Sequence, residues 1–289
     1  MKKIIFVILF LFSISSSDAQ SIRSDQDCLR HPSFPKKFGF DSQTAMLSTA
    51  EIHDRGLTLI DPASPQKKSY KHPTWRLAGS LGGMTFDEKG TVYTFPAPHV
   101  ELTFNPPTAQ NILYKVNPEN GIMSQWINLP INAKAFDQNV FGILGITFSC
   151  FSKSIYVSSV MGSSRTKELG KIYQLNAETG AILNTIENFD GFGLATASLN
   201  NKWLLFLGNA RTSDLYSVPL NDQGAFIGKP KRIFSLIGLG PRGDDKIKKI
   251  IIKEQGLQIT GFEFNFNLSA TWELQQTFYQ IPLNKLHMN

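Results

Sequence analysis

Three arginines in loop-like segments have the residue type and setting to bind an anion. Arg165 lies in the phrase Ser-Ser-Arg-Thr (163–166), Arg211 in Ala-Arg-Thr-Ser (210–213), and Arg242 in Gly-Pro-Arg-Gly (240–243). Guanidinium groups match carboxylate, phosphate and sulfate oxygens with paired N–H donors. Three of them at one concave surface, with the amide of Asn209 beside Arg211, would make a binding site for a small anionic molecule.

An alternative gives each arginine a structural role. Acidic side chains stand near all three in the sequence, and an ion pair with one of them would hold a loop rather than a ligand; these acids are Glu168, Asp214 and Asp244. Both interpretations stay open at this point. On the first, replacing Arg211 by alanine weakens ligand binding and leaves the fold intact, because a loop arginine adds little to core packing.

Carboxylates and amides in neighbouring loops are candidate ligands for Ca²⁺ or another divalent metal. Calcium takes six to eight oxygen ligands, and the candidates are Asp190, Asp244, Glu263 and Asn265. The last two belong to the segment 262–267, whose alternation places three phenylalanines on one face and polar side chains on the other. No contiguous calcium-binding loop is present, so the alternative is that these groups cap turns and strand edges.

His99 and Glu101 share a loop with prolines and are the candidates for a catalytic acid/base pair. The alternative is that His99 is a structural or exposed histidine. The Gly-x-Ser-x-Gly motif of α/β-hydrolases is absent. We therefore favour a protein without catalytic activity.

A strand-like phrase with a central tyrosine recurs along the chain and predicts the elements that carry these loops. It begins near Leu113, Ile172, Leu215 and Phe278, with a weaker copy near Leu57. Repetition every roughly 40–60 residues is typical of a propeller or array. An apolar hairpin precedes most copies, and a polar turn and one more strand follow, so each repeat supplies the four strands of one blade. The prediction is an all-β protein, a single β-propeller of five or six four-stranded blades.

The N-terminus predicts export. Residues 1–19 have the basic start, the apolar run from Ile4 to Ile14 and the small polar end of a signal peptide. Cleavage after Ala19 would leave a secreted or periplasmic protein without a transmembrane segment. Residues 20–40 would then form an N-terminal segment and residues 41–289 the propeller domain.

Cysteine and charge content limit the partners. Cys28 and Cys150 are the two cysteines; a disulfide between them would persist in an oxidising compartment, and two free thiols are the alternative. The net charge of +6 is mild, and the densest basic cluster, 246–249, resembles the exposed face of a strand. Nucleic acid is therefore not an expected partner.

Residues 145–180 suggest a family. They include Gly-Ile-Thr-Phe, Ile-Tyr-Val-Ser-Ser and Gly-Lys-Ile-Tyr-Gln-Leu-Asn-Ala-Glu-Thr-Gly. This resembles blades of the six-bladed propellers related to NHL-repeat, SMP-30/gluconolactonase and strictosidine-synthase proteins, over most of residues 80–285. The resemblance favours six blades. Lactonase-like members hold a divalent metal through a Glu that usually opens a Glu-Gly-Pro motif, which this chain lacks. The leader is similar to those of exported Bacteroidetes-type proteins.

These observations favour an exported binding protein whose loop face holds a small anionic molecule or an envelope protein. The alternatives are a metal-dependent, lactonase- or esterase-like hydrolase and a structural component of an envelope or secretion assembly. Three features would distinguish these functions. A binding protein should have a pocket lined by few polar groups, a hydrolase a converging set of catalytic or metal-binding groups, and an assembly component a large apolar patch.

Overall fold

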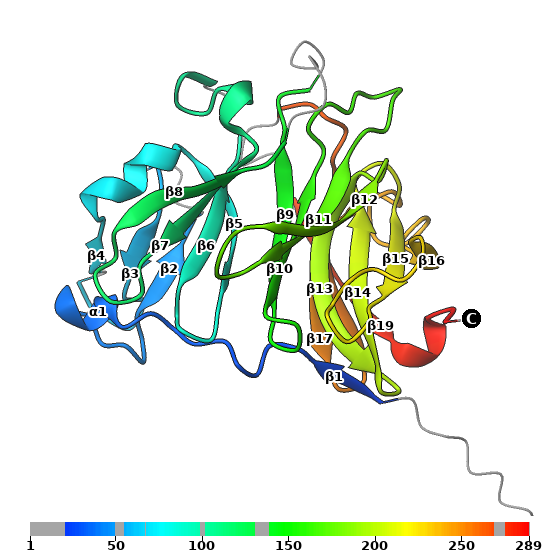
Figure 1. Ribbon diagram of the computed structural model, residues 1–289, viewed down its shortest axis with the longest axis horizontal. Helices are drawn as coiled ribbons and strands as arrows, with labels where there is room; N and C mark the ends of the chain where they lie inside the picture. The colour runs from blue at the N-terminus through cyan, green and yellow to red at the C-terminus, as the bar shows by residue number, and fades with distance from the viewer. Residues whose placement is uncertain are drawn as a thin grey trace, which may run out of the picture.

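A computed structural model describes residues 21–49, 55–66, 68–98, 102–130, 139–268 and 275–288. They form five antiparallel sheets arranged as a β-propeller (Figure 1). The predicted all-β propeller of five or six blades is confirmed. The sixth blade that the family resemblance favoured is not found in these ranges.

The sheets follow one another in chain order. The first blade holds β2 (Met46–Ser48), β3 (Thr58–Ile60) and β4 (Ser69–Tyr70). The second holds β5 (Leu81–Phe86), β6 (Val92–Pro96), β7 (Ile112–Val116) and β8 (Met123–Asn128). The third holds β9 (Ile143–Ser149), β10 (Ser154–Ser159), β11 (Lys171–Asn176) and β12 (Ile182–Glu187).

The fourth blade consists of β13 (Gly191–Leu199), β14 (Lys202–Asn209), β15 (Asp214–Pro219) and β16 (Lys231–Ser235). The fifth contains β17 (Lys246–Lys253), β18 (Gly256–Phe262) and β19 (Gln276–Pro282). Helical elements are short: α1 (Phe34–Lys37), η1 (Pro73–Ala78), η2 (Leu102–Phe104), η3 (Pro107–Ala109) and η5 (Leu283–Lys285). None of the helices in the described ranges is long and apolar enough to cross a membrane.

Packing between neighbouring blades explains the strand sequences. Strands β5, β9, β13 and β17 lie side by side at the centre. Every residue of β10 and β13 is buried, whereas the outer strand β12 is exposed or half-buried along its length. A strand covered on both faces has no reason to alternate polar and apolar residues, and these inner strands do not. The recurring tyrosine phrase forms the third strand of the second to fifth blades, β7, β11, β15 and β19.

The turn after that third strand repeats because one asparagine organises it. The Asn176 Oδ1 accepts hydrogen bonds from the backbone N–H groups of Glu178 (3.0 Å) and Thr179 (2.8 Å). Gly180 then adopts a φ of +77°, a left-handed conformation that favours glycine. Asn117 accepts the equivalent two bonds in the second blade, and in the fourth blade Asn221 accepts from the N–H groups of Gln223 and Ala225. The side chain mimics a backbone turn, so sequence and geometry recur together.

The N-terminal segment runs beneath the blades and fastens them (Figure 1). Strand β1 (Ile22–Ser24) joins the inner edge of the fourth blade by pairing with β13. The buried Asp25 carboxylate accepts hydrogen bonds from the third blade, from the Ser149 hydroxyl at 2.5 Å and the Phe151 N–H at 2.9 Å. Cys28 forms a disulfide with Cys150, with a Cα–Cα distance of 5.8 Å. The segment then reaches the second blade.

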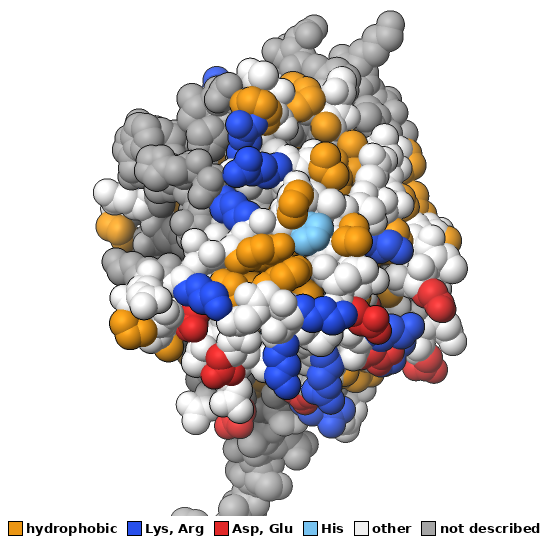
Figure 2. Space-filling model, turned by 90° about the vertical axis from the view of Figure 1, so that its left-hand side faces the viewer, with side chains coloured by type: hydrophobic (Ala, Val, Ile, Leu, Met, Phe, Trp, Pro, Cys, Tyr) orange, Lys and Arg blue, Asp and Glu red, His pale blue; other side chains and the backbone are white. Residues whose placement is uncertain are grey.

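The first blade and α1 form the left-hand side of the molecule in Figure 1, and Figure 2 shows that side face-on. Hydrophobic side chains gather there beside a histidine, with basic side chains near them. In this blade the half-buried rings of Phe38 and Tyr70 stack with centroids 4.2 Å apart, and the His72 ring lies 6.0 Å from Phe38. Lys36 and Lys37 occupy the last turn of α1. This side therefore combines half-buried rings with exposed lysines, and acidic side chains lie among its basic ones in Figure 2.

Candidate functional site

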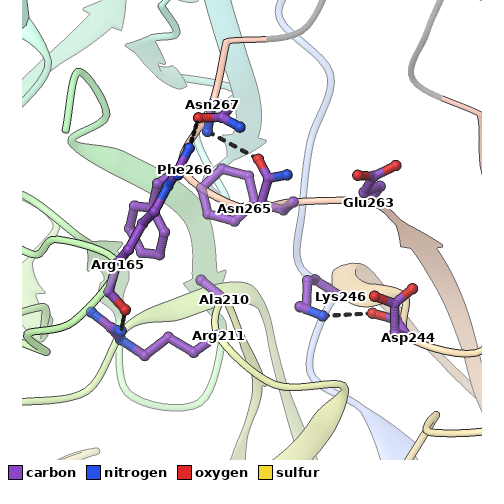
Figure 3. Close-up of a pocket in the computed structure, with 10 residues that line it drawn as sticks. Arg165, Ala210, Arg211, Asp244, Lys246, Glu263, Asn265, Phe266 and Asn267 are labelled. Atoms are coloured by element: carbon purple, nitrogen blue, oxygen red, sulfur yellow. Dashed lines mark hydrogen bonds between the residues drawn. The ribbon is translucent and has the colours of Figure 1, made fainter. Parts of the chain in front are cut away.

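A cavity of about 390 Å³ lies among loops at the upper end of the blades in Figure 1, whereas the N-terminal segment runs along their lower end. It is formed by the β10–β11 and β14–β15 loops, the residues around the start of β17, and the chain after β18 (Figure 3). The lining residues are Arg165, Ala210, Arg211, Asp244, Lys246, Glu263, Phe264, Asn265, Phe266 and Asn267. Three blades therefore contribute to one pocket.

Phenylalanines hold the segment after β18 across this face. Phe262, Phe264 and Phe266 are each at most 8% exposed. The Phe264 ring packs 5.2 Å from Phe192 of the fourth blade and 5.1 Å from Phe141, just before the third. Burial of these rings supplies the driving force for the crossing. The alternating Glu263, Asn265 and Asn267 are consequently exposed.

Arg165 is exposed at the edge of the pocket. Its Nη2 donates a hydrogen bond to Oδ1 of Asn267, which links the third blade to the segment after β18. Its other guanidinium N–H groups donate no hydrogen bond to the described residues. Of the three arginines, Arg165 is therefore the one whose donors can reach a ligand.

Arg211 lines the pocket but is held by the protein. Its Nε donates to Oδ2 of Asp190 at 2.5 Å, Nη1 donates to the carbonyl of Arg165 at 3.1 Å, and Nη2 donates to the carbonyls of Ser164 and, at 2.6 Å, Lys167. The guanidinium thus organises the loop that presents Arg165. The Asn209 amide is also structural, because its Oδ1 accepts from the N–H groups of Arg211 (2.7 Å) and Thr212 (2.9 Å).

Asp190 is fully buried beneath Arg211. Its Oδ1 accepts hydrogen bonds from the Ser163 hydroxyl and, at 2.9 Å, from the Gly170 N–H. Burial raises the pKa of this carboxyl above its usual value, although Ser163 and Arg211 act in the opposite direction. These donors occupy both carboxylate oxygens, so Asp190 is separate from the other candidate metal ligands.

Arg242 lies outside the pocket lining. It pairs with the buried Asp245, Nε to Oδ1 at 2.5 Å and Nη2 to Oδ2 at 3.0 Å, and also donates to the Thr277 hydroxyl. The Tyr279 hydroxyl donates to Asp245 Oδ2 at 2.7 Å. Burial and this hydrogen bond raise the pKa of Tyr279 to about 12. The structure therefore brings two of the three arginines to the pocket, and one of these has donors to spare.

The Asp245 carboxyl leads to a pH-dependent prediction. Burial acts to raise its pKa, but hydrogen bonds from Arg242, Tyr279 and Thr277 outweigh burial and lower it below the usual value. A lowered folded-state pKa gives stability that is present above the unfolded pKa of about 3.9 and is lost as the pH falls through the folded-state pKa. In Asp245→Asn, we expect a lower melting temperature than wild type at pH 7 and a narrowing difference toward pH 3. A constant difference would contradict the assignment.

The remaining candidates are divided between the pocket and the rest of the chain. Asp244, Glu263 and Asn265 line the pocket together, with no cluster of three His, Cys, Asp or Glu side chains suited to a metal in the described ranges. His99 and Glu101 lie outside those ranges. Lys246 lines the pocket but was not among the candidates, because its alternation with isoleucine indicated only an exposed strand face.

Comparisons with known proteins find only distant structural similarity. No family model matches the chain, and no curated protein matches it. Among solved structures, a chain of a nidogen/laminin complex has a TM-score of 0.48 at 10% identity, covering 85% of this chain and 78% of that one. A gluconolactonase from Xanthomonas campestris has a TM-score of 0.43 at 13% identity, with coverages of 76% and 67%. Regucalcin from Agrobacterium tumefaciens has a TM-score of 0.42 at 13% identity, covering 78% of this chain and 72% of that one. Nothing about ligands or activity carries over at this level.

Proposed function

We propose that this protein is an exported binding protein whose pocket holds a small ligand with a carboxylate, phosphate or sulfate group. The observation that carries the proposal is the Arg165 guanidinium, exposed at the edge of a 390 Å³ cavity with one hydrogen bond to the described residues. An arginine with spare N–H donors in a concave site is suited to oxyanions. The volume lies at the small end of the range for ligand pockets, roughly 300–1,000 Å³.

The surroundings of Arg165 support this role. Arg211 fixes the backbone carbonyls on both sides of Arg165, and a rigid loop loses less entropy when a ligand binds. Lys246 adds a second cation to the lining, and the Asn265 and Asn267 amides add polar groups. Export is supported by the leader-like residues 1–19 and by the disulfide, since disulfides persist in oxidising compartments. The described residues give the hydrolase alternative no advantage over binding.

The test is anion binding to the variant Arg165→Ala. Calorimetric titration with inorganic phosphate, sulfate and succinate identifies the best probe for the wild-type protein. We expect the Kd for that probe to rise at least tenfold in the variant, with an unchanged melting temperature, because the Arg165 side chain is exposed. The matched control is Arg30→Ala, which removes another exposed arginine on the opposite face.

Unchanged binding in Arg165→Ala would overturn the assignment of this pocket. A second cavity of about 310 Å³ beside the β7–β8 turn has Lys115 as its charged lining residue. Binding that survived loss of Arg165 and failed in Lys115→Ala would move the anion site to that cavity.

A further inference from the structure

Free acids line the same pocket as Arg165. Glu263 and Asp244 are both exposed, and neither carboxylate forms a hydrogen bond or an ion pair with any other residue that the structure describes. Figure 3 shows both on the opposite side of the cavity from Arg165. A pocket built for an anion alone has no use for two free carboxylates, because they repel the ligand.

The other charged residues that line the pocket have partners within the protein. The Arg211 guanidinium is offset by the buried Asp190 carboxylate, 2.5 Å away. The Lys246 ammonium donates to the backbone carbonyl of Asp244 at 2.6 Å, so this cation adjoins the acidic wall. The lining cation with the most unused N–H donors is therefore Arg165. Glu263 and Asp244 are the acids whose carboxylates form no hydrogen bond or ion pair with the described residues, although Glu263 interacts electrostatically with the Arg242 guanidinium, which is paired with Asp245.

The amides between these walls keep the opposite charges apart. Asn267 accepts from Arg165 through its side chain, and its backbone N–H donates to the Asn265 Oδ1 at 3.1 Å. These bonds hold the guanidinium at the Asn267 end of the segment after β18, while Glu263 projects at the start of that segment (Figure 3). Arg165 thus remains unpaired with either acid, and the cavity lies between them.

We propose that the pocket selects a zwitterion, a free amino acid or a very short peptide. Its carboxylate binds Arg165 and its ammonium group binds Glu263, with Asp244 as the second acid. This inference rests on the proposed function, since it takes Arg165 as the anion site. A ligand with both charges satisfies both walls, whereas an anion without an amine meets the repulsion of the free carboxylates.

The test compares each of the common L-amino acids, and glycylglycine, with its N-acetylated form by calorimetric titration at pH 7. Acetylation removes the ammonium charge and keeps the carboxylate. We expect at least one free form to bind at least tenfold more tightly than its acetylated form. In Glu263→Gln, which keeps the side-chain shape, we expect that preference to fall to threefold or less.

Glu254→Gln is the matched control, because Glu254 is an exposed acid at the opposite end of the same hairpin. This variant should prefer free over acetylated forms to the same extent as wild type. Equal binding of free and acetylated forms, lost in Arg165→Ala, would overturn the zwitterion inference and leave the anion site standing. Absence of binding by the free forms, the acetylated forms, phosphate, sulfate and succinate alike would overturn both proposals. A preference unchanged by Glu263→Gln would also overturn the inference.

Discussion

Replacing Arg211 by alanine should destabilise the protein by about 3–5 kcal/mol at pH 7, the cost of removing one partner from a buried ion pair. Asp190 is fully buried and the Arg211 side chain is 20% exposed, so solvent cannot replace the lost guanidinium well. The backbone carbonyls of Ser164, Arg165 and Lys167 in the β10–β11 loop each lose a donor in the same change, and only that of Lys167 keeps another among the described residues, the Ser164 N–H at 2.9 Å. Urea unfolding followed by circular dichroism measures the difference in unfolding free energy.

The same variant should show a distinctive pH dependence. Without Arg211, burial raises the pKa of the Asp190 carboxyl further above its unfolded value. A raised folded-state pKa means that stability is retained at low pH and lost as the pH rises through that pKa. The stability difference from wild type should therefore widen as the pH rises from about 3.9, the ordinary pKa of an aspartate, toward neutral pH.

Asp190→Asn in the Arg211→Ala background is the control for this mechanism. The amide removes the buried charge and keeps an oxygen that can accept from Ser163 and Gly170, so part of the lost stability should return. A loss below about 1 kcal/mol in Arg211→Ala, independent of pH, would show that the ion pair is not structural. Arg211 would then return to the list of candidate ligand-binding residues.

The contacts of Arg211 lead us to expect lower stability in Arg211→Ala, whereas the sequence alone led us to expect an intact fold. Both roles of a loop arginine were open, and the acids considered as its partners lay close in sequence. The observed partner, Asp190, is 21 positions away and reaches Arg211 because two neighbouring blades bring their loops together. Sequence periodicity predicts blades well, since each repeat contains the strand and turn residues of its own blade. It carries no information on which loop side chains meet between blades.

Arg242 illustrates the same limit at short range. Asp245 is three positions away, a spacing that has a fixed meaning on a helix and none in an irregular loop. Strand β1 was also beyond prediction, because three residues are too few to show a period. By contrast, the alternation at 262–266 correctly separated the three rings from the polar side chains, and the structure buries the rings because burial of large apolar groups is strongly favourable.

Among covalent changes, loss of the disulfide between Cys28 and Cys150 should reduce the free energy of unfolding the most. Cys28 and Cys150 are 122 positions apart, and closing a loop of that length destabilises the unfolded chain by about 5 kcal/mol on the chain-entropy model. We expect the double variant Cys28→Ser/Cys150→Ser to lose an unfolding free energy of this size at pH 7 in urea. Dithiothreitol should lower the stability of the wild-type protein to a similar extent and leave the double variant unaffected.

The folded state should survive this loss, because other bonds hold the N-terminal segment on both sides of Cys28. Strand β1 remains paired with β13, Asp25 still binds Ser149 and Phe151, and the Phe34 N–H donates to the Pro118 carbonyl at 3.0 Å. The double variant should therefore keep the wild-type circular dichroism spectrum at 25 °C and bind the same anions. An unfolded double variant would mean that the disulfide, rather than these contacts, places the segment beneath the blades. Unchanged stability in both the variant and the reduced wild-type protein would mean that the two thiols are not joined.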